Sequence, residues 1–332
     1  MPILWCGGED VDFIVFSGCS MNTSSTYFRS GYARAGIATS ISSAGRSTIF
    51  PGGAITSGWL SVRIYFTGAV GSAQYPIGLG YSSSGVKGLY VGTDTSTSSK
   101  AALYKYDGTT YTKLASEVGT SLSTSFLHKI DLNVSAFNDT VNGNAKVYID
   151  GNLVIDYTGD LTVSGVTSLD CVMISKGGYS GTTYFYISEI IVADSSTVNM
   201  SLVTNYPNAA GDSNSWTGAY TDIDETTIDD SDVVYDNNVG HQALFGLRDL
   251  PSGSFSVLAI KEAIRACKSS DSTPTSINLG VKSGGTVSVS DNHSLSTSWA
   301  TKERYMATNP VTGNAFTPSE VNSLQLALEA AA

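Results

Sequence analysis

Apolar and polar residues alternate along several short stretches of the chain. The clearest is Trp59–Thr67 (WLSVRIYFT), in which every second residue from Leu60 onward is apolar. Because a period of two places alternate side chains on opposite faces, this pattern predicts a β-strand with one buried face. Comparable runs predict strands at Met1–Trp5, Asp12–Phe16, Ile77–Tyr81, Gly88–Val91, Ala102–Tyr106, Thr110–Leu114, Phe126–Val134, Val172–Ser175 and Tyr184–Ala193.

A hairpin is predicted within Lys146–Tyr157 (KVYIDGNLVIDY). Two apolar runs there flank Asp150-Gly151-Asn152, and Gly151 tolerates the positive φ that a tight turn requires. The strand predicted at Tyr184–Ala193 (YFYISEIIVA) then alternates as a half-buried strand does.

The second half of the chain continues the short-strand pattern. Phe255–Cys267 (FSVLAIKEAIRAC) has the composition of a helix, but its apolar residues keep a period of two, so we interpret it as a strand. Thr317-Pro318-Ser319-Glu320 forms a capping box with proline at the first helical position, which predicts one helical turn containing Val321. Other predicted strands are Ile277–Val281, Thr286–Ser290, Glu303–Ala307 and Leu324–Leu328.

These elements predict an all-β protein with two antiparallel β-sandwich, jelly-roll-like domains and minimal helix. A length of 332 residues suits two domains, each able to bury its own core. A proline-, glycine- and asparagine-containing connection at about 197–208 sets the expected boundary, which gives domains 1–197 and 198–332.

The composition limits the classes of function. Charged residues make up only 14% of the chain, and such a surface of hydroxyls and amides is typical of extracellular or virion β-proteins. The net charge of −11 argues against nucleic acid as a partner, since phosphate binding requires lysine and arginine. With no apolar run of about 18 residues and an acidic start, we expect neither membrane insertion nor conventional secretion. Release by lysis, as for bacteriophage particles, fits these features.

Cysteines and acidic residues supply two weak site hypotheses. Cys6, Cys19, Cys171 and Cys267 are far apart and suit small buried apolar positions, although Cys6 and Cys19 are close enough in sequence to form a cross-link. The acid-rich stretch 222–236 contains Asp222, Asp224, Asp229 and Asp230, which suggest a calcium loop. The glycine of the usual calcium-binding pattern is missing, so a solvated loop is the alternative. No other cofactor is predicted.

Several stretches resemble proteins of tailed bacteriophages. MPILWCGGEDVDF, HKIDLNV, KVYIDGNLVIDYTGDL and YFYISEIIVAD are similar to the laminin-G-like (concanavalin A-like) jelly-roll domain of virion structural proteins. In the second half, DIDET, DDSDVVYD, LFGLRDLP, VLAIKEAIRACKS and TNPVTGNAFTPSEVNSLQ resemble a module of phage tail, fibre or decoration components. The family pattern closes with a glycine and a basic residue, whereas this chain ends in small residues.

No catalytic constellation is recognisable in the sequence. The two carboxylates of a glycosidase, the G-x-S-x-G turn of a serine hydrolase and a histidine in a triad pattern are all missing. Binding is chemically feasible, because tyrosine rings stack on sugars while amides and carboxylates bind hydroxyls. The candidate glycan-binding residues are Tyr104, Tyr106, Asp107, Tyr111, Tyr179 and Tyr184. The alternative is that these tyrosines occupy strands because of their β-propensity.

Three functional hypotheses follow. The first is a non-enzymatic virion structural protein, in the tail, collar or head, that assembles with copies of itself and other virion proteins and adheres to the host surface. The alternative is a receptor-binding lectin module for a host polysaccharide, and the third is a glycan depolymerase. Repeated copies in a particle would convert weak binding into avidity.

Overall fold

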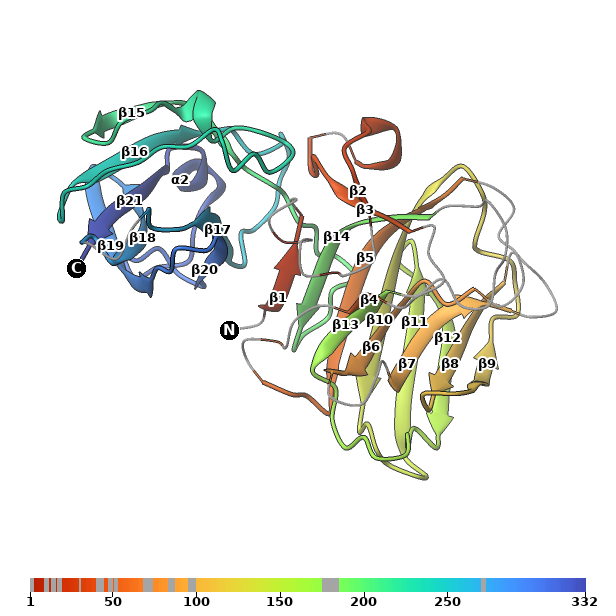
Figure 1. Ribbon diagram of the computed structural model, residues 1–332. Coiled ribbons are helices and arrows are strands. Elements are labelled where there is room, and N and C mark those ends of the chain that lie inside the picture. Colours follow the sequence, from red (N-terminus) through yellow and green to blue (C-terminus); the bar gives the residue numbers. More distant parts are fainter. Residues whose placement is uncertain are drawn as a thin grey trace. The chain divides into compact units, whose positions relative to one another are not determined.

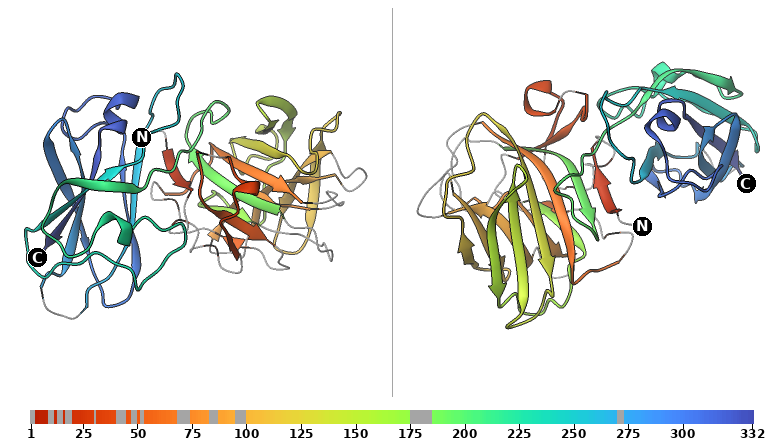
Figure 2. Two further views of the ribbon diagram at one scale, coloured as in Figure 1. Left: turned by 90° about the horizontal axis from the view of Figure 1, so that it is seen from above. Right: turned by 180° about the vertical axis from the view of Figure 1, so that it is seen from behind.

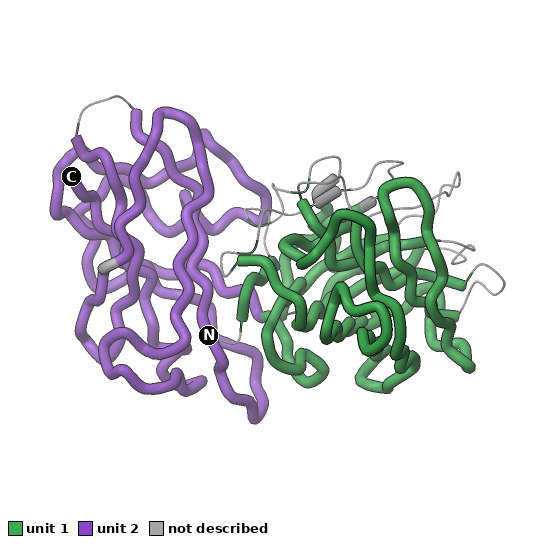
Figure 3. Tube along the Cα trace, turned by 90° about the horizontal axis from the view of Figure 1, so that it is seen from below, with its two compact units in different colours: residues 1–202 green, residues 203–332 purple. Residues whose placement is uncertain are grey.

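The chain divides into two compact units, Met1–Leu202 and Val203–Ala332, each described here by itself (Figure 3). The computed structural model describes residues 3–8, 12, 16, 20–29, 31–39, 45–46, 50, 53–67, 74–82, 87–94, 100–174, 185–269 and 273–332. Nearly all of its regular structure is antiparallel β-sheet, which confirms the predicted fold class.

The first unit contains an eight-stranded sheet, which we call sheet A. Its strand order is β12-β11-β10-β5-β14-β3-β2, and β1 pairs with β14 beside this path. Its strands are β1 (Ile3–Gly7), β2 (Ser20–Asn22), β3 (Gly36–Thr39), β5 (Gly58–Phe66), β10 (Leu127–Ser135), β11 (Gly143–Ile149), β12 (Asn152–Gly159) and β14 (Phe185–Ala193).

Sheet B is the six-stranded second sheet of this unit, with the order β4-β13-β6-β7-β8-β9. Figures 1 and 2 show the two sheets as the layers of a sandwich. The strands of sheet B are β4 (Gly45–Arg46), β6 (Ile77–Tyr81), β7 (Lys87–Thr93), β8 (Ala101–Tyr106), β9 (Tyr111–Ser116) and β13 (Cys171–Ile174).

A single apolar core lies between the two sheets. Along β5, Leu60, Val62 and Ile64 point into it, as the alternating sequence predicted. Sheet B contributes Leu79, Leu103 and other residues to the same core. The side chains between these positions therefore lie on the outer face of each sheet, turned away from the shared core.

The hairpin of β11 and β12 has the predicted turn. Both central residues are in the left-handed region, with φ of 50° at Asp150 and 83° at Gly151. Two positive φ angles define a type I′ turn, whose twist matches that of paired strands. The Asp150 carboxylate accepts hydrogen bonds from the Lys129 backbone N–H, at 2.8 Å, and from His128 Nδ1, at 2.7 Å, which ties the turn to β10.

The second unit contains a five-stranded sheet in the order β15-β16-β21-β18-β19, and β17 pairs with β20. Met306, Val281 and Val321 pack into one of its apolar clusters. The capping box predicted at Thr317 and Glu320 is confirmed, and Val321 of the helical turn is buried. The elements are β15 (Pro207–Asn214), η3 (Tyr220–Asp222), β16 (Gln242–Leu247), β17 (Ile260–Ala266), β18 (Ser276–Ser283), β19 (Thr286–Ser294), β20 (Ala300–Met306), α2 (Pro318–Asn322) and β21 (Gln325–Ala331).

Some strand predictions differ from the structure. The strand expected at Phe255–Cys267 begins only at Ile260, and the exposed side chains of Phe255 and Leu258 precede it. The short strands β2 and β3 were not predicted, because their few residues show no extended alternation. The longer strands β15 and β16 were not predicted either, because PNAAGDSN has the composition of a connection and QALFGL does not alternate strictly. Most of the strand predicted at Asp12–Phe16 lies outside the described residues.

Candidate functional site

Five tyrosines gather on the outer face of sheet B. Five pairs of their rings are in contact there, and three of these pairs include Tyr111. Tyr75 stacks on Tyr111 with ring centroids 3.6 Å apart, and Tyr106 stacks on Tyr111 at 4.2 Å. Tyr90 meets Tyr111 edge to face at 5.3 Å. The tyrosine layer, as we call this group, consists of Tyr75, Tyr90, Tyr104, Tyr106 and Tyr111.

Strand register explains why these side chains meet. Tyr104 of β8 pairs with Tyr90 of β7, and Tyr106 of β8 pairs with Tyr111 of β9. Residues that pair across antiparallel strands point to the same face, so the rings form adjacent rows. Glycine leaves room for them, because a Cβ at Gly78 would lie 3.0 Å from the Tyr90 ring and one at Gly92 would lie 3.0 Å from the Tyr75 ring.

The layer is buried at its centre and half-buried at its edge. Tyr90 is fully buried and Tyr104 is 1% exposed, whereas Tyr106 and Tyr111 are intermediate. Burial raises the pKa of Tyr75 and Tyr90, and Tyr111 raises the pKa of Tyr90 further. These two hydroxyls therefore stay neutral at physiological pH. The part of the layer open to a ligand is the stacked pair of Tyr106 and Tyr111.

A polar group adjoins this pair. Lys113 extends from β9, in register with Tyr104, and its ammonium lies 3.2 Å from Asp94 Oδ2. The Ser116 hydroxyl donates to the same carboxylate. The Asp94 side chain is nearly buried while that of Lys113 is 40% exposed, so the lysine is the accessible member of this pair.

The glycan-binding residues predicted from the sequence lie in different environments in the structure. Tyr104 is on the correct face, but its ring is buried and its hydroxyl donates to the Thr93 carbonyl at 2.7 Å, which makes it a structural residue. The Asp107 carboxylate closes a turn by accepting from the Thr109 and Thr110 backbone N–H groups, and these bonds lower its pKa to about 2. Tyr179 and Tyr184 lie outside the described residues.

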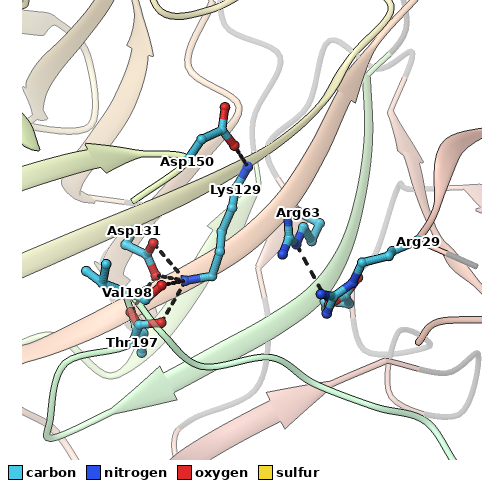
Figure 4. Close-up of polar contacts among 8 residues, drawn as sticks. Arg29, Arg63, Lys129, Asp131, Asp150, Thr197 and Val198 are labelled. Carbon is cyan, nitrogen blue, oxygen red and sulfur yellow. Dashed lines mark hydrogen bonds and ion pairs between the residues drawn. The ribbon is translucent and has the colours of Figure 1, made fainter. Parts of the chain in front are cut away.

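A buried charged network lies on the outer face of sheet A (Figure 4). The Lys129 ammonium contacts Asp131 Oδ1 at 2.7 Å and donates to the backbone carbonyls of Thr197 and Val198 at 2.7 and 2.9 Å. Asp131 is fully buried and also accepts from the Thr197 hydroxyl. Burial lowers the pKa of Lys129, but Asp131 opposes that shift. This network fastens the segment after β14 to strand β10.

Two arginines on the same face share one carboxylate. Arg29 binds Glu189 through both carboxylate oxygens, with Nη2 to Oε2 at 2.6 Å, while Arg63 Nε lies 3.9 Å from Oε2 (Figure 4). Glu189 sits at an irregularity in the pairing of β14 with β5 and has a φ of 49°. Burial raises the pKa of Glu189, and Arg29 offsets part of that shift.

A serine, a histidine and an aspartate form a hydrogen-bonded chain at the start of β10. The Ser123 hydroxyl lies 3.0 Å from His128 Nε2, and His128 Nδ1 lies 2.7 Å from Asp150 Oδ2. This connectivity was not predicted from the sequence, since the three residues match no motif. The Ser123 backbone N–H also donates to Nε2, at 3.0 Å. Because a neutral imidazole has a single acceptor lone pair, that backbone bond competes with proton transfer from the hydroxyl.

Three of the four candidate calcium ligands have separate partners in the structure. Asp222 accepts from the Ala219 backbone N–H at 2.8 Å, Asp229 closes a turn with Ser231, and Asp230 binds Arg265 through two hydrogen bonds. Among the described residues, no group of three or more histidine, cysteine, aspartate or glutamate side chains is placed to hold a metal ion. The calcium loop and its alternative, a solvated loop, both stay predictions.

The cysteine cross-link stays a prediction, because Cys19 lies outside the described residues. Cys6 is buried in β1, Cys171 is buried on the outer face of sheet B, and Cys267 is partly exposed.

In the described ranges of the chain, no helix has the length and apolar character needed to cross a membrane.

Sequence reasoning missed Tyr75, Tyr90 and the paired charges of sheet A. Tyr90 could have been found from the sequence. In residues 88–92 (GLYVG), Gly88 and Gly92 lie on the same face of the predicted strand as Tyr90 and leave space for its large ring. Arg29 and Glu189 are 160 residues apart and carry no such signal.

Comparisons with known proteins place the chain in no family. No family model matches it, and no curated protein matches it. Among solved structures, the binding domain of Paraclostridial Mosquitocidal Protein 1 has a TM-score of 0.39 at 9% identity, covering 58% of this chain and 49% of that chain. This chain thus spans about half of that domain.

Two further solved structures have similar scores. Alginate lyase Aly36B has a TM-score of 0.39 at 11% identity, covering 61% of this chain and 100% of that chain. The carbohydrate binding module CBM66 from Bacillus subtilis has a TM-score of 0.36 at 10% identity, covering 54% and 96% respectively.

Proposed function

We propose that this protein is a non-catalytic carbohydrate-binding protein whose first unit recognises a polysaccharide through Tyr106, Tyr111 and Lys113. The observation that carries this proposal is the stacked, half-exposed pair of Tyr106 and Tyr111 at the outer edge of sheet B. This proposal keeps the lectin hypothesis drawn from the sequence but changes the residues of the site. Tyr104 is buried and Asp107 forms a turn, so their exposed neighbours are proposed to contact the ligand.

The geometry suits a sugar chemically. Tyrosine rings offer flat apolar faces to the C–H groups of a pyranose and keep hydroxyls for polar contacts. Tyr106 is held in place from two sides, because its ring stacks on Tyr111 and its hydroxyl donates to the Gly108 carbonyl at 2.8 Å. A side chain that is already ordered loses little entropy when a ligand binds, and this favours affinity. The Lys113 ammonium supplies a donor for sugar hydroxyls.

Binding without catalysis is part of the proposal. Asp94, the carboxylate beside the exposed pair, is held by Lys113 and Ser116, which suits a positioning role. Glycoside hydrolysis in most families needs two carboxylates flanking the scissile bond. A depolymerase would release new reducing ends from a bound polysaccharide, and we expect none.

The test is a glycan array followed by titration of the best ligand with the full chain. Tyr106→Ala and Tyr111→Ala should each weaken binding about tenfold or more, the equivalent of about 1.4 kcal/mol. Tyr235→Ala is the matched control, since Tyr235 is an exposed tyrosine of the second unit. Unchanged affinity in both Tyr106 and Tyr111 variants, with an intact fold, would refute this site.

A role in a bacteriophage particle is a second proposal. It is supported by the resemblance of both halves to virion proteins and by the exposed apolar side chains of Val118, Phe126 and Val141, which suit contacts with copies of the chain or other virion proteins. Imaging of purified particles tests it. Regular copies on the capsid or tail support a virion location and release by lysis, whereas particles that lack the chain refute it.

A further inference from the structure

Arg63 occupies the middle of β5 on the outer face of sheet A, and its charge is incompletely satisfied. Its Nε atom is buried and has no hydrogen-bond partner in the described structure. Glu189 Oε2 lies 3.9 Å from that nitrogen, which is close enough for an ion pair but too far for a hydrogen bond. The side chain is 18% exposed, so solvent reaches part of it.

A second unsatisfied group lies directly across from this arginine. Ser188 of β14 pairs in register with Arg63 of β5, so both side chains point to the same face. The Ser188 hydroxyl is also buried and has no hydrogen-bond partner among the described residues. A buried polar group that lacks a partner costs about 1–3 kcal/mol, so two such groups at neighbouring positions require an explanation.

Arg63 shares the counter-charge nearest to it with Arg29. Among the described residues, Glu189 is the carboxylate within ion-pair distance of both arginines, and Arg29 already binds both of its oxygens. Lys129 and Asp131, on the neighbouring strand β10, satisfy each other. Glu189, Asp131 and Asp150 all supply negative charge near Arg63, but none of these carboxylates makes a hydrogen bond to its Nε in the described structure. A ligand carboxylate would supply that contact.

Aromatic side chains continue this surface. Tyr186 pairs with Tyr65 across the same two strands, and Tyr27 stacks on Tyr186 with ring centroids 3.7 Å apart. Tyr27 also approaches Tyr65 at 5.2 Å. All three tyrosines are half-buried, so parts of their rings face solvent next to the arginine.

We propose that this surface is a second binding site, for a saccharide that carries a carboxylate. The carboxylate binds the Arg63 guanidinium and the Ser188 hydroxyl, after a small side-chain rearrangement that exposes them, and the sugar ring lies against Tyr65 and Tyr186. A guanidinium presents paired donors that match the two oxygens of a carboxylate, and an adjoining tyrosine provides a face for the ring. The site is on sheet A and is independent of the Tyr106 and Tyr111 pair on sheet B.

The test compares two ligands that differ only in the carboxylate. Full-length protein is titrated calorimetrically with oligomers of galacturonate, mannuronate and glucuronate, and with the same oligomers after reduction of the carboxylates to primary alcohols. At least one unreduced oligomer should bind about tenfold or more tightly than its reduced form, and this preference should weaken as salt rises.

Variants assign the preference to Arg63. Arg63→Gln should abolish it, and Arg63→Lys should retain part of it, because lysine keeps the charge but lacks the paired donors. Arg265→Gln is the matched control, since it removes one arginine charge from the second unit. Ser188→Ala should weaken the preference without removing a charge, and melting curves exclude variants that fail to fold.

The outcomes separate this proposal from the proposed function. Equal binding of reduced and unreduced oligomers, an unchanged preference in Arg63→Gln, or no binding of any uronate oligomer overturns the carboxylate site. Tyr106→Ala and Tyr111→Ala should leave the carboxylate preference intact. Loss of neutral-glycan binding in those variants with a normal uronate preference would support both sites independently.

Discussion

Glu262 is a buried carboxyl group whose protonation should control the stability of the second unit. It lies on β17, pairs in register with Arg304 of β20, and is 7% exposed. Its Oε1 accepts the Gly280 backbone N–H at 3.3 Å, while Oε2 has no partner in the described structure. Burial raises the pKa of Glu262 to about 8, Arg304 and the Gly280 bond oppose that shift, and Asp291 adds to it.

The pH dependence follows from this raised pKa. An unfolded chain releases the Glu262 proton near pH 4.3, whereas the folded chain keeps it up to about 8. The stabilising effect is therefore complete below the unfolded pKa and is lost as the pH rises through this range. We expect the melting temperature of the second unit to fall between pH 5 and pH 8, and Glu262→Gln to remove that dependence. Glu303→Gln on β20 is the control, and an identical slope in Glu262→Gln would contradict the prediction.

Gly151 tests the turn of the β11–β12 hairpin. Its φ of 83° is strained for any residue with a side chain, although a Cβ there would meet nothing closer than Val198 at 4.0 Å. Gly151→Val should therefore destabilise the first unit through backbone strain alone, by about 1 kcal/mol or more, in a denaturant titration. Gly119→Val is the control, because a Cβ at Gly119 meets nothing within 4 Å. An unchanged midpoint for Gly151→Val would argue against the left-handed turn.

Prediction of the two sites from sequence succeeded only where the relevant residues are close in the chain. Tyr106 and Tyr111 meet because a short turn joins β8 and β9, so their proximity was foreseeable. The sequence pattern predicted that Arg63 lies on the polar face of a strand. Its missing hydrogen bond, however, depends on Ser188 and Glu189. Their strand was predicted from the sequence, but its pairing with β5 was not. The exposure of a side chain could not be predicted from the sequence either. Tyr104 and Tyr106 look equivalent in the sequence, but only Tyr104 lies at the buried centre of the tyrosine layer.

At the scale of elements, glycine lets neighbouring strands of sheet B carry large side chains. A Cβ at Gly78 of β6 would lie 2.3 Å from the Leu89 carbonyl oxygen, and backbone cannot move aside as a flexible side chain does. Gly78→Ala should thus destabilise the first unit by about 1–3 kcal/mol, the usual range for overpacking. It should also disturb the ring of Tyr90, which lies 3.0 Å from the same Cβ position.

The control for Gly78→Ala is Gly119→Ala, which adds the same methyl group in open space. Denaturant titration and near-ultraviolet circular dichroism, which reports on packed tyrosines, measure the two effects. Equal stability and equal near-ultraviolet spectra in the two variants would contradict the close approach of β6 and β7 at Gly78.

Strands with long alternation were the elements that sequence predicted best. The pattern at Trp59–Thr67 gave β5 nearly to the residue, and the capping box gave α2, because each depends on local chemistry. The order of strands within a sheet depends on contacts between distant residues, so β5 beside β14 and β10 could not be read from either pattern. Short strands such as β2 depend entirely on such partners.

At the scale of the whole molecule, the second unit should fold without the first. All strands of its five-stranded sheet come from residues 207–331, and its apolar clusters draw on the same unit. A fragment of residues 203–332 should therefore show a β-sheet spectrum and one cooperative unfolding transition. The control fragment 203–306 lacks α2 and β21, and since β21 lies between β16 and β18, its removal splits the sheet. We expect the shorter fragment to be unfolded. If the longer fragment were unfolded as well, the second unit would need the first for stability, and its core would be incomplete alone.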